Sequence, residues 1–386
     1  MDMELTEEQV AIRDAVAELC ADFPDAYWIE QDERDEYPHE FVKALGDAGW
    51  LSILIPEEYG GGGRPIADGA VVLETINRSG GSGTPIHAQM YTMGTILRHG
   101  SDEQKQRFLP KIAAGELRLQ AFGVTEPDAG SDTTRIRTRA VRDGDNYVIN
   151  GQKMWTSRFE FSDLMLLIAR TTPYEEVDKK HDGVSVFIVD LRDVGDQIES
   201  RKIKTMVNHH TYELFFNDLV VPAENRIGEE GKGFRYILSG MNAERVLTAS
   251  GMLGNGFFFI DRAVKYASER EVFGRPIGMN QGVQFPIAQA YAQLEAASLV
   301  RWQAAEAFEK GDRKSPAPNM AKLLASQALW AAANACMDAY GGVGLAVEYG
   351  IERKFRDARL AQIAPINNNL VLAGLAHNTL GLPKSY

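Results

Sequence analysis

Residues 121–132 read AFGVTEPDAGSD, and this stretch decides the fold. Apolar and polar residues alternate over 121–125, which is typical of a β-strand, and proline and glycine residues then interrupt the alternation. The end of such a strand offers backbone N–H groups, together with the hydroxyls of Thr125 and Ser131, to a ligand rich in hydrogen-bond acceptors. We therefore expect a ligand-binding turn, and a plain surface loop is the alternative interpretation.

Composition and charge restrict the class of protein. The chain has 386 residues, 44% of them hydrophobic, which is enough for two or three packed layers around substantial cores. Its net charge of −13 argues against a nucleic-acid partner, because phosphates require a basic face. We expect no membrane span and no N-terminal signal, and the two cysteines, Cys20 and Cys336, are expected as buried thiols in a cytoplasmic protein.

The spacing of hydrophobic residues changes twice along the chain. Apolar residues at helical spacing follow a capping box at Thr6-Glu7-Glu8-Gln9 and continue to about residue 117. Short alternating runs between turns then indicate β-structure, until helical periodicity returns after a glycine-rich segment and persists to the end. The sequence predicts an α+β multidomain protein, with a helical domain at 1–117, a β domain at 118–228 and a helical domain at 229–386.

Five motifs resemble those of the acyl-CoA dehydrogenase family, in the same order over nearly the whole chain. Residues 121–132 are similar to its flavin-binding signature VTEPxAGSD, and 150–157 (NGQKMWTS) to the element behind the flavin ring. The other three are the "RxxFGxPI…Q", "GGxG" and "RDA" elements, matched by 270–277 with Gln281, by 340–344 and by 356–359. The chain is identified as a member of this family.

The resemblance implies an architecture and an activity. The architecture is an N-terminal helical domain, a middle β-barrel domain and a C-terminal four-helix bundle, in which the alanine-rich segment 321–335 is expected to be buried nearly all round. The activity is FAD-dependent dehydrogenation of an acyl-CoA in fatty acid or branched acyl catabolism, with electrons passed to an electron-transferring flavoprotein. A homotetramer is expected, and a mixed tetramer remains an alternative.

The resemblance also implies which residues contact FAD. The flavin ring and ribityl chain are expected at Phe122, Val124, Thr125, Gly130, Ser131, Trp155 and Ser157. The adenosine diphosphate portion is expected at residues that come partly from a neighbouring subunit: Arg270, Phe273, Gln281, Gly341, Gly342, Asn367 and Asn369. An arginine suits the pyrophosphate because its planar fork binds two oxygens.

The catalytic base is expected at Glu244. Dehydrogenation of a thioester needs a base for the α-proton, donors for the enolate-like oxygen and a flavin for the β-hydride. Many family members carry the base in a "YEGT" motif, but Pro365 stands at that position here. Glu244 matches a second known location, an "ER" pair on the first helix of the C-terminal bundle. The alternative interpretation is an ordinary helical glutamate.

Two further expectations concern the substrate. Ser131 and Arg245 are the expected substrate-binding residues, although Arg245 also suits a structural role. Pro365 has no N–H to donate to the thioester oxygen, so a backbone donor at Ala364 or Ile366 is expected to replace it. The acyl chain is expected to be short or medium, straight or branched, and CoA versus a carrier-protein thioester stays open.

Other functions remain open at this stage. A flavin oxidase or monooxygenase would share the fold, and a non-catalytic subunit of a mixed tetramer would explain the departures at Pro365 and at Asp338, where many members have glutamine. No metal is expected, because the pair His209-His210 has no third ligand at a suitable spacing.

Overall fold

The structure is a computed structural model that describes residues 5–384, and it divides into two compact units. The first, the helical unit, combines the chain up to Phe41 with Pro65–Gly83 and everything from Asn242 onward. The second, the sheet unit, contains Val42–Arg64 and Thr84–Met241. Two helices run across these divisions, α3 (His39–Asp47) and α7 (Gly233–Glu269).

The helical unit begins with the predicted capping box, which is confirmed. The Thr6 hydroxyl accepts a hydrogen bond from the Gln9 N–H at 3.2 Å, and the Gln9 side chain accepts one from the Thr6 N–H at 3.2 Å. This exchange satisfies N–H groups that a helix start leaves without partners. The helices of this unit that lie outside the bundle core are α1 (Glu7–Ala21), α2 (Asp25–Glu33), α4 (Ile66–Arg78), α10 (Ile351–Leu360) and α11 (Asn368–Gly374).

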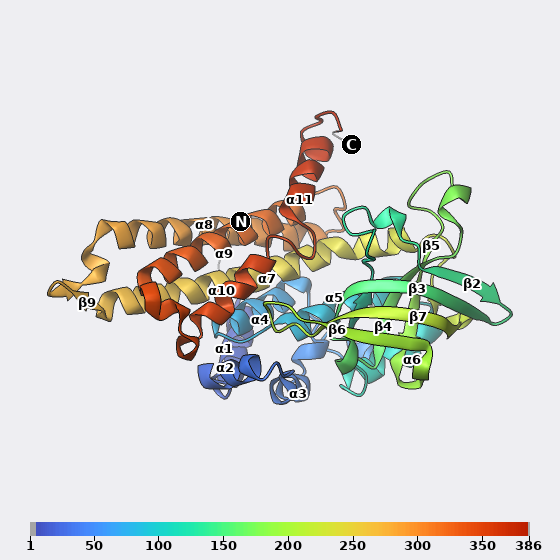
Figure 1. The fold of residues 1–386 in the computed structure, drawn as a ribbon, viewed down its shortest axis with the longest axis horizontal. Coiled ribbons are helices and arrows are strands. Elements are labelled where there is room, and N and C mark those ends of the chain that lie inside the picture. The colour runs from blue at the N-terminus through green and yellow to red at the C-terminus, as the bar shows by residue number, and fades with distance from the viewer. Residues whose placement is uncertain (1–4, 385–386) are drawn as a thin grey trace. The chain divides into compact units, whose positions relative to one another are not determined.

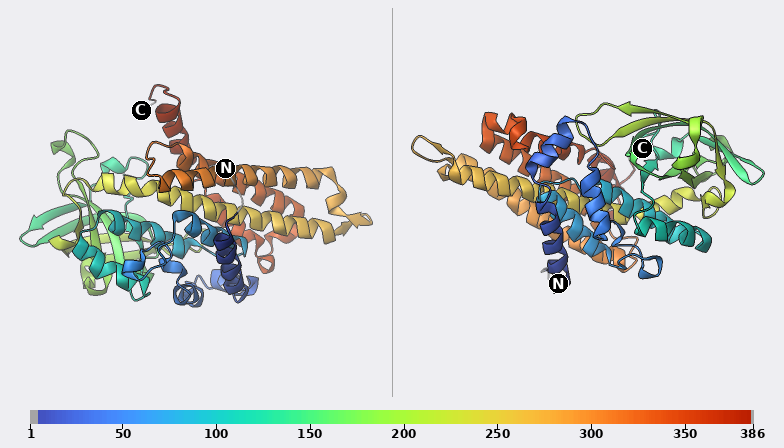
Figure 2. Two further views of the ribbon diagram at one scale, coloured as in Figure 1. Left: turned by 180° about the vertical axis from the view of Figure 1, so that it is seen from behind. Right: turned by 90° about the horizontal axis from the view of Figure 1, so that it is seen from below.

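Three long helices form the bundle of the helical unit. The part of α7 from Asn242 onward runs beside α8 (Gln281–Glu309) and α9 (Ala317–Tyr340), as Figures 1 and 2 show. A short hairpin of β9 (Glu271–Val272) and β10 (Arg275–Pro276) joins α7 to α8. Segment 321–335 is buried over most of its surface, with only Leu324 and Gln327 exposed, as its alanine-rich sequence predicts.

Two buried cations tie α10 to the end of α4. Arg353 Nη2 donates to the Gly80 carbonyl at 2.7 Å, and Lys354 Nζ donates to the Gly81 carbonyl at 2.8 Å. Burial lowers the pKa of Lys354 to about 7. Carbonyl groups just beyond a helix C-terminus are suitable acceptors for such cations, so this contact fixes the C-terminal segment on the N-terminal one.

The sheet unit contains α5 (Thr84–His99), α6 (Asp102–Ala113) and one eight-stranded sheet. Seven strands follow the order β6-β7-β3-β2-β4-β5-β8, and β1 pairs in parallel with β4. The strands are β1 (Leu119–Gly123), β2 (Arg139–Asp143), β3 (Asn146–Ser157), β4 (Leu164–Arg170), β5 (Val184–Asp190), β6 (Ile198–Ile203), β7 (Thr211–Pro222) and β8 (Arg226–Ile227).

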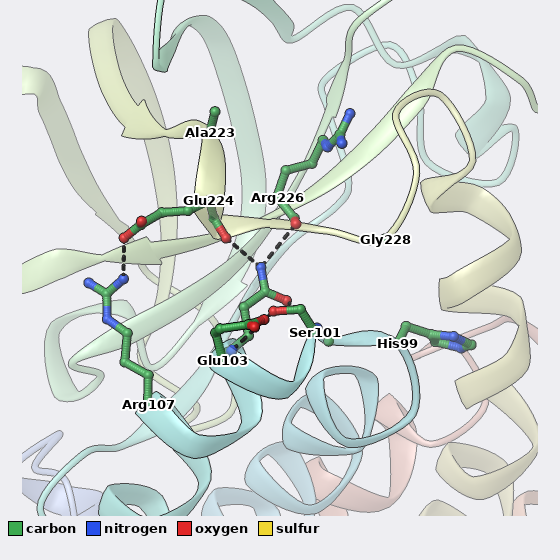
Figure 3. Close-up of a pocket in the computed structure, with 10 residues that line it drawn as sticks. His99, Ser101, Glu103, Arg107, Ala223, Glu224, Arg226 and Gly228 are labelled. Atoms are coloured by element: carbon green, nitrogen blue, oxygen red, sulfur yellow. Dashed lines mark hydrogen bonds and ion pairs between the residues drawn. The ribbon is translucent and has the colours of Figure 1, made fainter.

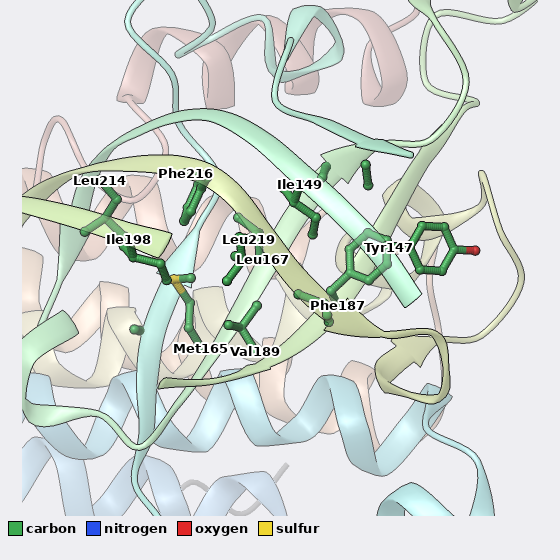
Figure 4. Packing of buried hydrophobic residues seen from close by; sticks show 14 of the residues in the cluster. Tyr147, Ile149, Met165, Leu167, Phe187, Val189, Ile198, Leu214, Phe216 and Leu219 are labelled. Atoms are coloured by element: carbon green, nitrogen blue, oxygen red, sulfur yellow. The ribbon is translucent and has the colours of Figure 1, made fainter. Parts of the chain in front are cut away.

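Buried side chains from alternate positions of these strands form the core of the sheet unit. Figure 4 shows Tyr147 of β3 beside Phe187 of β5, and Ile149, Met165 and Leu167 belong to the same cluster. Alternation puts these residues on one face, which explains why the sequence of 118–228 reads as short strands. The domain limits predicted at 117 and 228 stay predictions.

Both cysteines are buried free thiols, as predicted, and burial raises the pKa of Cys20 to about 11 and that of Cys336 to about 12. Within residues 5–384 no helix combines the length and the apolar character needed to cross a membrane.

Candidate active site

The signature loop leaves the sheet at the end of β1 and is held by β3. Met154 N–H donates to the Thr125 carbonyl at 2.8 Å, and Lys153 Nζ donates to the Val124 carbonyl at 2.9 Å. The loop then closes on itself, because Glu126 and Ala129 exchange two backbone hydrogen bonds. Thr125 and Trp155 are thereby carried by two directly bonded segments of chain.

A buried ion pair strengthens this attachment. Lys153 Nζ lies 2.7 Å from Glu126 Oε1, and the two side chains are 0% and 7% exposed. The backbone N–H groups of Arg137 and Thr138 also donate to the Glu126 carboxylate, at 2.5 and 3.0 Å. Burial works to raise the pKa of Glu126, but the charge of Lys153 and these hydrogen bonds outweigh it, so the pKa lies below its usual value.

Trp155 is presented in an unusual conformation beside this pair. Its φ of +61° lies in the left-handed region, which bulky residues avoid, and its side chain is 54% exposed. The next residue, Thr156, is buried, and no described residue forms a hydrogen bond with its hydroxyl. Ser157 Oγ lies 3.0 Å from the Thr211 hydroxyl. Strain of this kind persists where the surrounding structure enforces it, most often at functional sites.

The residues of the sheet unit that were predicted to contact the flavin ring have the chemistry and the free space that a flavin ring requires. The exposed indole of Trp155 offers an apolar face, and a Cβ built at Gly130 would meet only Thr125 Cγ2, at 4.0 Å, so the loop leaves room beside it. Phe122 is half-buried, with its ring 5.9 Å from that of Tyr91. Val124 and Ser131 lie on the same loop, at its beginning and after its turn.

The residues predicted for the adenosine diphosphate portion lie in the helical unit and are open to contact. Phe273 is fully exposed at the tip of the β9–β10 hairpin, Arg270 and Gln281 flank the hairpin and are exposed, and nothing lies within 4 Å of a Cβ built at Gly341 or Gly342. Asn367 instead caps α11, because its side chain accepts from the Leu370 N–H at 2.9 Å, while Asn369 is exposed. Their predicted role in cofactor binding stays a prediction.

Glu244 lies in the bundle part of α7 and is only 7% exposed. Thr248, one helical turn later, donates its hydroxyl to Glu244 Oε1 at 2.8 Å. Burial raises the pKa of the Glu244 carboxyl above its usual value, and the Thr248 hydrogen bond and the charges of Arg245 and Lys322 oppose that rise without cancelling it. Arg245 Nη1 donates to the Asn242 side chain at 3.2 Å. The carboxyl is therefore buried and unusually basic.

Lys322 is a fully buried cation near Glu244 that the sequence did not suggest. Its Nζ donates to Asn368 Oδ1 at 2.8 Å, and the Ser326 hydroxyl donates to the same oxygen at 3.1 Å. Burial lowers the pKa of Lys322 to about 8, although the charge of Glu244 opposes this. The side chain of Asn368 thus fixes the position of the Lys322 ammonium, which interacts electrostatically with the Glu244 carboxylate.

The chain around Pro365 leaves one backbone donor available. The Ala364 N–H donates to the Leu360 carbonyl at 2.9 Å, so it is already engaged. The half-buried Ile366 N–H makes no hydrogen bond to the described residues. Of the two replacements that the sequence left open, Ile366 has the unused donor.

The sheet unit also contains an open pocket, which none of the predicted site residues lines. It measures about 530 Å³ and is lined by the start of α6 and the segment before α7. Figure 3 shows Arg107 paired with Glu224 and the side chain of Gln104 bonded to the backbone of the same segment. The Nε atom of Arg226, which also lines the pocket, is buried and has no hydrogen-bond partner among the described residues. Within residues 5–384, no group of three potential metal ligands is found.

Sequence reasoning missed two features of the site, the Glu126–Lys153 pair and Lys322. A signal for the first exists, because Lys153 occupies an inward position in the alternation of β3, where an unpaired charge would be strongly unfavourable. Lys322 gives a similar signal, because it lies in segment 321–335, which the sequence predicts to be buried nearly all round, but the sequence does not identify its partner Asn368.

Comparisons with known proteins identify the family of the chain. Profiles of the N-terminal, middle and C-terminal domains of acyl-CoA dehydrogenases match residues 6–116, 121–219 and 231–365. The chain is 35% identical to acyl-CoA dehydrogenase FadE12 of Mycobacterium tuberculosis, over 99% of this chain and 98% of that protein.

Solved structures show the same likeness along the whole chain. The glutaryl-coenzyme A dehydrogenase–glutaryl-CoA complex superposes with a TM-score of 0.93 at 31% identity, covering 100% of this chain and 98% of that one. Butyryl-CoA dehydrogenase from Megasphaera elsdenii gives a TM-score of 0.92 at 28% identity, covering 98% and 100%. The helical, β and helical regions expected from the sequence are those of this fold, and the chain belongs to the acyl-CoA dehydrogenase family of flavoprotein oxidoreductases.

Proposed function

We propose that this protein dehydrogenates an acyl-CoA thioester between Cα and Cβ, with Glu244 as the base that takes the α-proton. The observation that supports this most is the burial of Glu244, which raises its pKa. The α-proton of a thioester is weakly acidic, and a carboxylate whose pKa is raised toward the working pH is a stronger general base than an exposed one. Pro365 cannot supply a base at the other family position.

The neighbours of Glu244 prepare it for this step. The Thr248 hydroxyl holds one carboxylate oxygen at 2.8 Å and thereby fixes the orientation of the group. The positive charges of Arg245 and Lys322 favour the ionised form, which is the form that accepts a proton. On balance the carboxyl remains more basic than an ordinary glutamate.

We further propose that FAD binds beside Trp155 and supplies the acceptor for the β-hydride. Thr125, Ser131 and Ser157 would donate hydrogen bonds to the ring and ribityl chain, and the Trp155 indole would cover the ring. Arg270, Phe273 and Gln281 would contact the adenosine diphosphate portion in another subunit of a homotetramer, for which their exposure in the single chain is suitable. An electron-transferring flavoprotein is the proposed acceptor of the electrons.

The thioester oxygen needs a donor as negative charge develops on it. We assign this role to the Ile366 N–H, because the Ala364 N–H is occupied by the Leu360 carbonyl and Pro365 has none. Loss of one such donor costs about 3 kcal/mol in other enzymes, so a replacement is needed for efficient catalysis.

The test is an anaerobic titration of the purified protein with acyl-CoAs from isobutyryl and isovaleryl to palmitoyl, followed by flavin absorbance. Bleaching by one length class supports dehydrogenation and identifies the acyl chain. A protein with a full flavin complement that no acyl-CoA bleaches would contradict the proposal. Rapid hydrogen peroxide formation in air would indicate an oxidase, and purification without flavin would indicate a non-catalytic subunit.

A further inference from the structure

Two hydroxyls face each other in the sheet unit, where β3 ends and β7 begins. Ser157 Oγ lies 3.0 Å from the Thr211 hydroxyl, and the two residues are direct partners in the register of these antiparallel strands. Thr211 is 7% exposed, whereas Ser157 is half-buried. The next pair along the strands, Thr156 and Tyr212, is fully buried, and Tyr212 belongs to the core cluster of the sheet. The two hydroxyls therefore lie on the opposite face of the sheet.

The direction of the hydrogen bond between Thr211 and Ser157 follows from burial. Within residues 5–384, the Thr211 hydroxyl forms a hydrogen bond with Ser157 alone. A buried hydroxyl proton needs an acceptor, so Thr211 donates and Ser157 Oγ accepts. The Ser157 proton then has no acceptor among the described residues, and the half-buried position of Ser157 leaves this proton accessible to a ligand. A hydroxyl that accepts one hydrogen bond donates a stronger one.

A second threonine–serine pair in the same sheet shows the difference. The hydroxyls of Thr171, just after β4, and Ser185, in β5, lie 2.9 Å apart. The Thr171 hydroxyl also donates to the Gly183 carbonyl at 3.3 Å, and Ser185 Oγ also accepts from the Gly231 N–H at 2.9 Å. Both hydroxyl protons of that pair thus have acceptors within the protein. One proton of the Ser157–Thr211 pair is left for a group from outside the described chain.

The backbone fixes the Ser157–Thr211 pair from both sides. An extra residue in β3 between Lys153 and Thr156 makes a β-bulge, and Trp155 has its φ of +61° in this bulge. Beyond the pair, the Arg158 N–H donates to the His210 carbonyl at 2.7 Å, and these two residues have φ values of +59° and +45°. Bulges and left-handed residues of this kind concentrate at functional sites, where they set the direction of side chains.

We propose that Thr211 is a positioning residue of the flavin site, whose hydroxyl directs the Ser157 proton to an acceptor atom on the flavin ring. The inference rests on the proposed binding of FAD beside Trp155. Hydrogen bonds to the flavin ring are one means by which a protein holds and tunes this cofactor. Without the Thr211 hydroxyl, the Ser157 hydroxyl can rotate, so its hydrogen bond to the ring is weakened even though Ser157 itself is still present.

The test compares Thr211→Val, which keeps the shape of the side chain and removes the hydroxyl, with Thr211→Ser, which keeps the hydroxyl. The dissociation constant of FAD is measured by fluorescence titration, and the visible absorption spectrum of the bound flavin is recorded. We expect Thr211→Val to raise the dissociation constant about 3- to 10-fold and to shift the absorption bands in the same direction as Ser157→Ala. Thr211→Ser should retain the wild-type values. In a Ser157→Ala background, Thr211→Val should have no further effect.

Thr171→Val is the matched control, because it removes a hydroxyl from the other threonine–serine pair of the sheet. It should leave the affinity for FAD and the spectrum unchanged. Wild-type affinity and spectrum in Thr211→Val, or an equal weakening with and without the Ser157 hydroxyl, would overturn the proposal. Thr211→Ala is subject to the same outcomes if Thr211→Val does not fold. FAD binding is measured without acyl-CoA, so a flavin that binds but is not bleached contradicts the proposed function alone.

Discussion

Glu126 and Glu244 are equally buried carboxylates whose pKa values are shifted in opposite directions. Glu126, in the sheet unit, contacts the Lys153 ammonium directly and accepts two backbone N–H bonds, and its pKa is lowered. Glu244, in the helical unit, receives a hydroxyl from Thr248, while the nearby Lys322 ammonium is bonded to Asn368, and its pKa is raised. Full pairing makes a carboxylate inert, and incomplete neutralisation makes it basic.

The difference assigns the two residues to different tasks. The Glu126–Lys153 pair connects the signature loop to β3 and so fixes the positions of Thr125 and Trp155, which makes it a structural element of the proposed flavin site. Glu244 is retained, in our account, for its chemistry. In our account, the carboxylate whose pKa is lowered by a directly paired ammonium supports the loop, and the carboxylate whose pKa is raised by burial takes part in the reaction.

The largest expected effect on stability is that of Glu126→Gln. Removal of the carboxylate leaves the ammonium of Lys153 buried without a counter-charge, so the free energy of unfolding should fall by about 3–5 kcal/mol. Urea unfolding measures this. The double variant Glu126→Gln/Lys153→Met should recover part of the loss, and a single-variant loss below about 1 kcal/mol would show that the pair does not hold the loop.

Trp155→Gly tests whether Trp155, which the Glu126–Lys153 pair holds in place, contributes to FAD binding. Glycine adopts a φ of +61° without strain, so the melting temperature of the flavin-free protein should stay the same or rise. Loss of the indole should raise the dissociation constant of FAD about tenfold, which corresponds to about 1.4 kcal/mol. Fluorescence titration with FAD measures it. Unchanged FAD affinity would remove Trp155 from the cofactor site.

Lys322→Met should make Glu244 still more basic, because it removes a positive charge that favours the ionised form. The rate of flavin reduction should fall about tenfold on the acid side of its pH profile and recover at higher pH. Lys322→Arg, which keeps the charge, should retain the wild-type profile. An equal loss at every pH would indicate a purely structural role for Lys322.

The smallest effects are opposite pH dependences of stability. The pKa of Glu126 is lowered by folding, so its stabilising contribution is present above pH 4.5 and is lost as the pH falls through the folded value. The pKa of Glu244 is raised by folding, so it opposes folding at high pH, and stability increases as the pH falls from its folded pKa towards 4.5.

Each contribution changes by no more than about 1.4 kcal/mol per pH unit. The free energy of unfolding is measured with urea for wild type, Glu126→Gln and Glu244→Gln at pH values on both sides of 4.5. The wild-type-minus-variant differences should depend on pH with opposite slopes. Slopes of the same sign would contradict the assigned pKa directions.

Local signals in the sequence predicted much of this structure. The capping box at Thr6 and the alanine-rich segment 321–335 depend on neighbouring residues, and the structure confirms them as a helix start and a buried helix. The alternation over 121–125 also indicates a strand, which the structure places two residues earlier, at 119–123. The interpretation of the signature loop as a flavin-binding element came from a family resemblance rather than from its residues alone.

Long-range contacts could not be predicted in the same way. The Glu126–Lys153 pair joins residues 27 positions apart, and its formation depends on the register of β3. The Lys322–Asn368 contact joins residues 46 positions apart.

In our account, Glu244 takes the α-proton of the substrate, whereas Glu126 only fixes the signature loop. The most direct measurement is the anaerobic rate of flavin reduction by a bleaching acyl-CoA in Glu244→Gln and Glu126→Gln, each normalised to bound flavin. The account predicts a loss of about 10²- to 10⁴-fold for Glu244→Gln and a rate within a few-fold of wild type for the flavin-bound fraction of Glu126→Gln. A Glu244→Gln protein that reduces its flavin at the wild-type rate would contradict it.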